Sequence, residues 1–327
     1  MLNEKKILST GFLMALPNML LFLFFFLVPM LIIVGYAFTP SLTFEILSEF
    51  SLENFKRILN EKYYISFLWS LILAFITTLI LLIICYPVAY GLVNIFGKTA
   101  NIITLLFIMP LFVTETVKIY GWSLFFLKGG ILNGILDYFA LPFPELMYSI
   151  PIIIIGLTYN FLPFMLFPLV LGIGLIPNEL RLAARDLGAT RLTVFFDVDL
   201  PIAKPGLIIG SLLTFVLSLS SMSESRMLGG KKIIMIADDI EFAFGYQQNW
   251  PLGSALSIIL AIVATIILLI LFRWLKIETF IKKYYNEKNK KFIILLIYNL
   301  FNYICNDSSY LCRNYVFLSP SFSNISF

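Results

Sequence analysis

The stretch Tyr63–Gly97, YYISFLWSLILAFITTLILLIICYPVAYGLVNIFG, contains no Asp, Glu, Lys or Arg. A helix needs about 20 apolar residues to cross the roughly 30 Å hydrocarbon core of a bilayer, so this stretch is long enough to span one. Four further stretches without these charged residues lie at Ile7–Phe44, Leu146–Asn178, Pro205–Ser223 and Phe242–Phe272. The sequence therefore predicts an all-α, polytopic membrane protein.

The composition excludes several classes of protein. Of the 327 residues 60% are hydrophobic and only 13% charged, against about 25% charged in a soluble domain. The chain has no histidine, which excludes Ser-His and Cys-His nucleophile pairs, HExxH zinc sites and His-ligated haem. Its three cysteines form no CxxC pair, so we expect neither a disulfide framework nor a structural metal. We therefore expect no catalytic residue, metal ion or cofactor in this chain, and no nucleic acid as a partner.

The apolar pattern predicts six spans, at about residues 11–38, 64–96, 101–127, 148–176, 205–222 and 252–274. Loops and flanks on the side of the N-terminus hold fourteen Lys and Arg, against seven on the other side. Cytoplasmic loops carry the excess of these residues, so both termini are predicted to lie on the cytoplasmic side of the membrane. We interpret residues 1–285 as one transmembrane domain and residues 286–327 as an atypical, poorly ordered tail.

One predicted cytoplasmic loop, residues 177–204, is longer than a simple connection. Asn178 is expected to cap a short helix, with Glu179 in its first turn, where a carboxylate is favourable. Leu180, Ala183, Ala184 and Leu187 follow at helical spacing on one face. Gly188-Ala189 should break this helix, and Leu200-Pro201 should turn the chain back towards the membrane. The pattern predicts a helical hairpin, and a merely solvated amphipathic loop is the alternative reading.

The loop resembles the "EAA" loop of importer-type ABC transporter permeases, whose pattern is E-A-A-x3-G-x9-I-x-L-P. Ala183, Ala184, Gly188, Leu200 and Pro201 match, whereas Leu182 stands where that family has Glu. The resemblance implies that the loop couples a partner ATPase to transport. The coupling residues it implies are Glu179, Ala183, Ala184, Leu187, Gly188, Ala189, Leu200 and Pro201.

Further motifs resemble spermidine/putrescine (PotB-like) importer permeases. They are YPVAY at 86–90, KIYGW at 118–122, GILNGIL at 130–136, YNFLP at 159–163, LGG at 228–230 and WPLGSA at 250–255. The resemblance implies that the chain is a type I ABC importer permease, a non-catalytic subunit through which polyamines cross the membrane. It also implies three kinds of partner: a cytoplasmic ABC ATPase dimer, a second homologous permease and an extracytoplasmic substrate-binding protein.

The chain contains no GxxxxGK[ST] phosphate-binding loop, so ATP hydrolysis is expected in a partner subunit. Iron, thiamine and phosphonate permeases share the general pattern, which leaves these substrates open. A secondary transporter or channel is a further alternative, although no inverted repeat is evident.

Charged and aromatic residues near the spans are candidates for the translocation path. Charges inside a membrane protein usually face the bundle interior or a water-filled path. Glu115 and Lys118 lie three residues apart in the third span, and they line the path or simply pair with each other. Aromatic rings attract cations, which adds a second kind of candidate. The complete candidate set is Glu115, Lys118, Tyr159, Glu224, Arg226 and Trp250.

Overall fold

The computed structural model describes residues 16–40, 50–142, 146–230 and 232–274. No β-strand occurs in these described residues, and six stretches are long and apolar enough to cross a membrane. They are Leu16–Ala37, Tyr64–Asn94, Glu115–Tyr138, Ile150–Gly174, Arg191–Leu219 and Trp250–Ile270. The prediction of an all-α protein with six spans is confirmed. The tail predicted at residues 286–327 lies outside the described residues.

The helices of the described part have the following bounds. In chain order they are η1 (Leu23–Leu27), α2 (Val28–Ala37), α3 (Glu53–Asn60), α4 (Tyr64–Asn94), η2 (Gly97–Thr99), α5 (Ala100–Ile108), η3 (Met109–Phe112), α6 (Glu115–Phe126), α7 (Ile131–Tyr138), α8 (Ile150–Gly174), α9 (Asn178–Asp186), α10 (Arg191–Val194), η4 (Phe195–Asp199), α11 (Leu200–Leu219), α12 (Ser223–Met227), α13 (Ile236–Gly245) and α14 (Trp250–Trp274).

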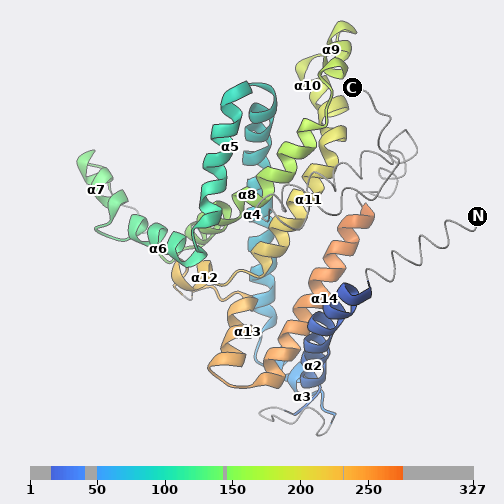
Figure 1. The fold of residues 1–327 in the computed structure, drawn as a ribbon. Helices are drawn as coiled ribbons and strands as arrows, with labels where there is room; N and C mark the ends of the chain where they lie inside the picture. The colour runs from blue at the N-terminus through green and yellow to red at the C-terminus, as the bar shows by residue number, and fades with distance from the viewer. Residues whose placement is uncertain (1–15, 41–49, 143–145, 231, 275–327) are drawn as a thin grey trace, which may run out of the picture. The chain divides into compact units, whose positions relative to one another are not determined.

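Helices α4, α8 and α11 form the centre of the bundle and lie side by side (Figure 1). Their buried side chains include Leu81, Leu166 and Ala203. Glycines let α8 and α11 approach closely, because a Cβ on Gly206 would lie only 2.2 Å from the carbonyl oxygen of Pro168. Small residues at such crossings are typical of helix packing in membranes, where lipid removes the hydrophobic drive for helices to associate.

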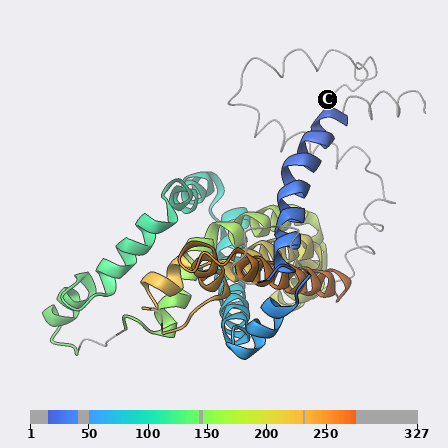
Figure 2. The ribbon, with the colours of Figure 1, turned by 90° about the horizontal axis from the view of Figure 1, so that it is seen from below.

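The expected third span, residues 101–127, is not one helix. Helix α5 ends at Ile108, the 3₁₀ turn η3 follows, and the chain is extended at Val113 and Thr114. Pro110 cannot donate the hydrogen bond that would continue the α-helix through this point. A new helix, α6, begins at Glu115, where a carboxylate is favourable at the positive helix end. Helices α6 and α7 extend away from α4 and α11 in both views (Figures 1 and 2).

The two ends of α4 hold different parts of the chain. Near its start, Ser70 Oγ accepts a hydrogen bond of 2.9 Å from the backbone N–H of Ile236, the first residue of α13. At its last residue, Asn94 Oδ1 accepts a bond of 2.5 Å from Arg181 in α9. From Ser70 to Asn94 a helix rises about 36 Å at 1.5 Å per residue. Because this exceeds a bilayer core of about 30 Å, α9 and α13 belong to opposite sides of the membrane.

Candidate functional site

The loop between α8 and α11 folds as a hairpin of α9 and α10. Helix α9 (Asn178–Asp186) ends in a C-terminal capping motif in which Gly188 has φ +86°. The N–H of Gly188 donates to the carbonyl of Arg185 at 2.8 Å, and that of Ala189 to Ala184 at 3.0 Å. These two bonds define a Schellman motif, which places glycine at the left-handed position. The predicted break at Gly188-Ala189 is therefore present, and its cause is conformational.

A buried arginine holds the hairpin to the bundle. Arg181 is 6% exposed, and its Nε lies 2.6 Å from Asp199 Oδ1, at the start of α11. Its Nη1 donates to Asn94 Oδ1 at 2.5 Å and to Asn178 Oδ1 at 3.1 Å. Its guanidinium also stacks 5.4 Å from the ring centre of Tyr90. Asn178 was expected to cap α9, but the N-cap residue is Pro177, and Asn178 is the first residue of the helix and accepts from Arg181.

Apolar side chains of the hairpin point away from the rest of the chain. Leu187 is 90% exposed, Leu192 70% and Leu182 58%. Of the residues expected to couple the ATPase, Glu179, Ala183, Leu187, Gly188 and Pro201 are exposed, and Ala184, Ala189 and Leu200 are half-buried. An added Cβ on Gly188 would meet nothing within 4 Å. The predicted apolar face of α9 therefore lies outside the bundle, while Arg181 occupies the inner side.

Three helices meet at a buried polar network about halfway along α8. The Lys118 ammonium of α6 donates to Asn160 Oδ1 of α8, and Asn160 Nδ2 donates to Glu224 Oε1 of α12 at 3.1 Å. Ser221 Oγ donates to the second carboxylate oxygen of Glu224, whose side chain is fully buried. Burial raises the pKa of Glu224 to about 6, and the negative charge of Glu115 acts in the same direction.

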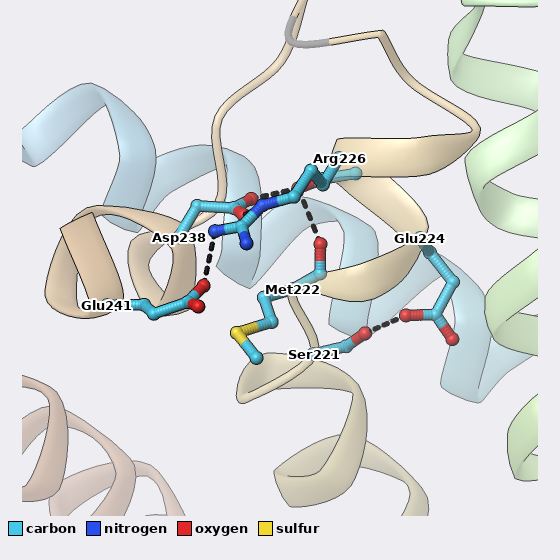
Figure 3. A network of polar contacts seen from close by, with 7 residues as sticks. Ser221, Met222, Glu224, Arg226, Asp238 and Glu241 are labelled. Carbon is cyan, nitrogen blue, oxygen red and sulfur yellow. Dashed lines mark hydrogen bonds and ion pairs between the residues drawn. The ribbon is translucent and has the colours of Figure 1, made fainter. Parts of the chain in front are cut away.

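Arg226 points to the opposite side of α12 from Glu224 (Figure 3). Its Nε lies 3.2 Å from Asp238 Oδ1, and its Nη2 pairs with Glu241, both on α13. Ser225 Oγ also donates to Asp238, whose pKa is raised mainly by burial. The positive charge of Arg226 is thus balanced by two carboxylates, and α12 presents an anionic side chain to α8 and a paired cation to α13.

The six candidate path residues do not form one cluster. The structure joins Lys118 and Glu224 through Asn160, and no ion pair connects Glu115 with Lys118 among the described residues. The Tyr159 ring lies 5.4 Å from that of Trp122, in an edge-on contact between α8 and α6.

Trp250, at the start of α14, packs elsewhere. Its ring lies 6.0 Å from both Tyr36 and Phe244. It thus belongs to a separate aromatic group between α2, α13 and α14, rather than to the Lys118–Glu224 network.

Sequence reasoning missed the residues that organise both sites. Asn160 is the bridge between Lys118 and Glu224, and Arg181 with Asp199 is the anchor of the hairpin. A lone amide inside a 25-residue apolar helix was the available signal for Asn160, because such a group must find a polar partner. No group of three or more His, Cys, Asp or Glu in the described residues is arranged to hold a metal ion.

The comparisons with known proteins agree with this geometry. Residues 94–277 match the family described as binding-protein-dependent transport system inner membrane component. The chain belongs to this family of ABC importer permeases and is a multi-pass protein of the bacterial inner membrane.

Its relatives include the spermidine/putrescine transport system permease protein PotB of Escherichia coli K12, which is 35% identical over 257 residues. That alignment covers 77% of this chain and 93% of the relative. PotB of Haemophilus influenzae is 34% identical over 255 residues, or 77% and 89% of the two chains.

Solved structures show the same fold. One is a bacterial alginate ABC transporter in complex with an alginate pentasaccharide-bound periplasmic protein. It matches with a TM-score of 0.68 at 18% identity, over 85% of this chain and 97% of that one. The likeness establishes the architecture of a type I importer permease.

Proposed function

We propose that this permease imports spermidine and putrescine, with an external binding protein delivering the cargo. The observation that carries the substrate class is the 35% identity to PotB over 77% of the chain. The structure supports it with a buried carboxylate, Glu224, which bonds Asn160 about halfway along α8. The pairing of Arg226 with Asp238 and Glu241 is also compatible with a polycation cargo, because these carboxylates balance a positive charge that would otherwise repel it.

The substrate is tested by uptake in cells that lack their own polyamine importers and express the whole system. We expect uptake of labelled spermidine, inhibited by excess putrescine and unaffected by thiamine or ferric iron. Absence of spermidine uptake, with vigorous transport of a metal chelate or an anion, would refute the polyamine assignment and leave the importer class intact.

We propose that the hairpin of residues 177–204 docks on a cytoplasmic ABC ATPase dimer, which hydrolyses the ATP. The coupling residues proposed from the sequence are Glu179, Ala183, Ala184, Leu187, Gly188, Ala189, Leu200 and Pro201. The support is geometric: three leucines of the hairpin, Leu182, Leu187 and Leu192, are exposed together, and a group of exposed apolar side chains marks an interaction surface. A second homologous permease completes the proposed complex.

Truncation of Leu187 tests the docking. Burying a leucine contributes about 1.5–3 kcal/mol, so Leu187→Ser should weaken ATPase association about 10- to 100-fold. Leu141→Ser is the control, because Leu141 is also exposed and lies in the connection between α7 and α8. Co-purification of the ATPase measures both. Equal recovery of the ATPase with Leu187→Ser and Leu141→Ser would contradict docking through Leu187. A separate variant, Leu182→Glu, restores the family residue and should preserve ATPase association.

The candidates for the proposed path remain Glu115, Lys118, Tyr159, Glu224, Arg226 and Trp250. The contacts support the Lys118–Asn160–Glu224 network as its core, whereas Arg226 and Trp250 pack against other groups. Glu224→Gln should lower uptake and leave the affinity of the binding protein for polyamine unchanged, since that protein recognises the cargo separately. Titration of the isolated binding protein and uptake by the variant system measure the two effects. Undiminished uptake would remove Glu224 from the path.

A further inference from the structure

The side chain of Lys118 has the chemistry of one end of a polyamine. It is a primary ammonium at the end of a four-carbon stem, the same group that ends a diaminobutane. In the structure this ammonium donates to the amide oxygen of Asn160, whose amide nitrogen donates to Glu224 at 3.1 Å. The protein thus places its own alkylammonium on the amide that also bonds the buried carboxylate.

Lys118 and Glu224 do not form a direct ion pair. An amide group stands between the cation and the anion, so their attraction is weaker than in direct contact, because Coulomb energy falls with distance. Glu224 is fully buried, whereas Lys118 is only half-buried and lies on α6, which is separate from the central bundle of α4, α8 and α11. Lys118 is therefore the more displaceable member of the network.

A cation tethered to the protein can speed the release of a polycation cargo. A buried carboxylate without a counter-charge is costly and would hold a polycation tightly, which slows release. A tethered ammonium satisfies the carboxylate between transport cycles and competes with the cargo during each cycle. Asn160 serves either cation, because its Oδ1 accepts from an ammonium while its Nδ2 remains on Glu224.

We propose that Lys118 is a built-in occupant of an ammonium subsite formed by Asn160, Glu224 and Ser221, and that a cargo ammonium replaces it during transport. The return of Lys118 then expels the cargo. This inference rests on the proposed polyamine function, which it deepens by assigning a release step to one residue.

The test measures cargo retained by the complete importer in lipid nanodiscs. Labelled spermidine is delivered by the binding protein, the complex is separated by gel filtration, and the retained label is counted. Lys118→Met keeps the stem and removes the charge. It should retain about tenfold more spermidine than the wild type, which is the increase in affinity expected when one neighbouring positive charge is lost. It should also transport spermidine more slowly. Lys118→Gln, which keeps an N–H donor, should act in the same direction.

Two controls separate this role from a structural one. Lys56→Met makes the same change at an exposed lysine of α3 and should leave retention at the wild-type level. Adding Glu224→Gln to Lys118→Met should abolish the extra retention, because the carboxylate that holds the cargo is gone. A packing defect would lower uptake without raising retention.

The possible failures are distinguishable. If the wild-type importer takes up spermidine but neither Lys118 variant retains more than the Lys56→Met control, the exchange role of Lys118 is refuted and the polyamine function stands. If the wild-type importer transports neither spermidine nor putrescine, the substrate assignment is wrong and the exchange proposal falls with it.

Discussion

Removal of the Arg181 side chain should release the cytoplasmic hairpin from the bundle. In the structure Arg181 pairs with Asp199 at 2.6 Å, donates to Asn94 and Asn178, and stacks on Tyr90, with only 6% of the residue exposed. Arg181→Met would keep most of the volume but leave the buried carboxylate of Asp199 without a counter-charge. Breaking a buried pair in this way costs about 3–5 kcal/mol.

That free energy converts into a change in hairpin opening. At about 1.4 kcal/mol per factor of ten, the opened population should rise by about 150- to 5,000-fold. Hydrogen exchange reports such local opening, so amides of Asn178–Asp186 should exchange faster by this factor in the reconstituted importer. Amides in the middle of α8 should keep their wild-type rates.

Two control variants test whether the effect comes from the anchoring role of Arg181. Arg185→Met makes the same change one turn further along α9, at an exposed arginine, and should change exchange less than threefold. Adding Asp199→Asn to Arg181→Met removes the uncompensated charge and should recover part of the protection. An Arg181→Met hairpin that exchanges like the wild type would refute the anchoring role.

Three further outcomes are expected. Gly188→Ala places a side chain at φ +86° and should destabilise the hairpin by about 1–2 kcal/mol, seen as weaker ATPase co-purification, whereas Gly174→Ala, at a helical glycine with open space, should not. Burial raises the pKa of Glu224 from 4.5 to about 6, so the folded state binds this proton more tightly and loses stability as pH rises through that window. Glu224→Gln should therefore stabilise the permease by about 2 kcal/mol above pH 7 and not below pH 4.5, as thermal unfolding against pH would show. Reporter tags within Thr190–Leu192 should be cytoplasmic and those near Ser48 external; an external signal from the first position would contradict docking to a cytoplasmic ATPase.

The number of spans and the helix break at Gly188 were predictable because each depends on local sequence. Uncharged length alone identifies a span such as Tyr64–Asn94, and a glycine after a short amphipathic helix marks its end. The third span was mispredicted because hydropathy does not detect that the chain becomes extended at Val113. Pro110 was the available signal, although Pro87 lies inside the unbroken α4. Proline alone therefore does not decide between a continuous and an interrupted helix.

The polar networks were not predictable because they depend on which helix faces meet. The apolar spacing placed Leu187 on one face of α9, where it is exposed, but gave no sign that the charged Arg181 would be buried. Asp199, which makes this burial possible, lies eighteen residues further along the chain. Asn160 likewise reaches Glu224 across sixty-four residues. Periodicity places a residue on a face but does not identify the partner on that face.

The two networks differ in a way that matches the two tasks of a coupled permease. Arg181 pairs directly with Asp199 and donates to Asn94, so the hairpin is attached to the start of α11 and the end of α4. Lys118 and Glu224 instead share an amide, which leaves the cation exchangeable. In the proposed docking, a force from the ATPase would reach the bundle through direct contacts at the hairpin, and in the proposed exchange, cargo would be released where contacts can be replaced. Direct pairing at the hairpin and spaced pairing between Lys118 and Glu224 therefore suit transmission and release respectively, and exchanging the two arrangements should impair both.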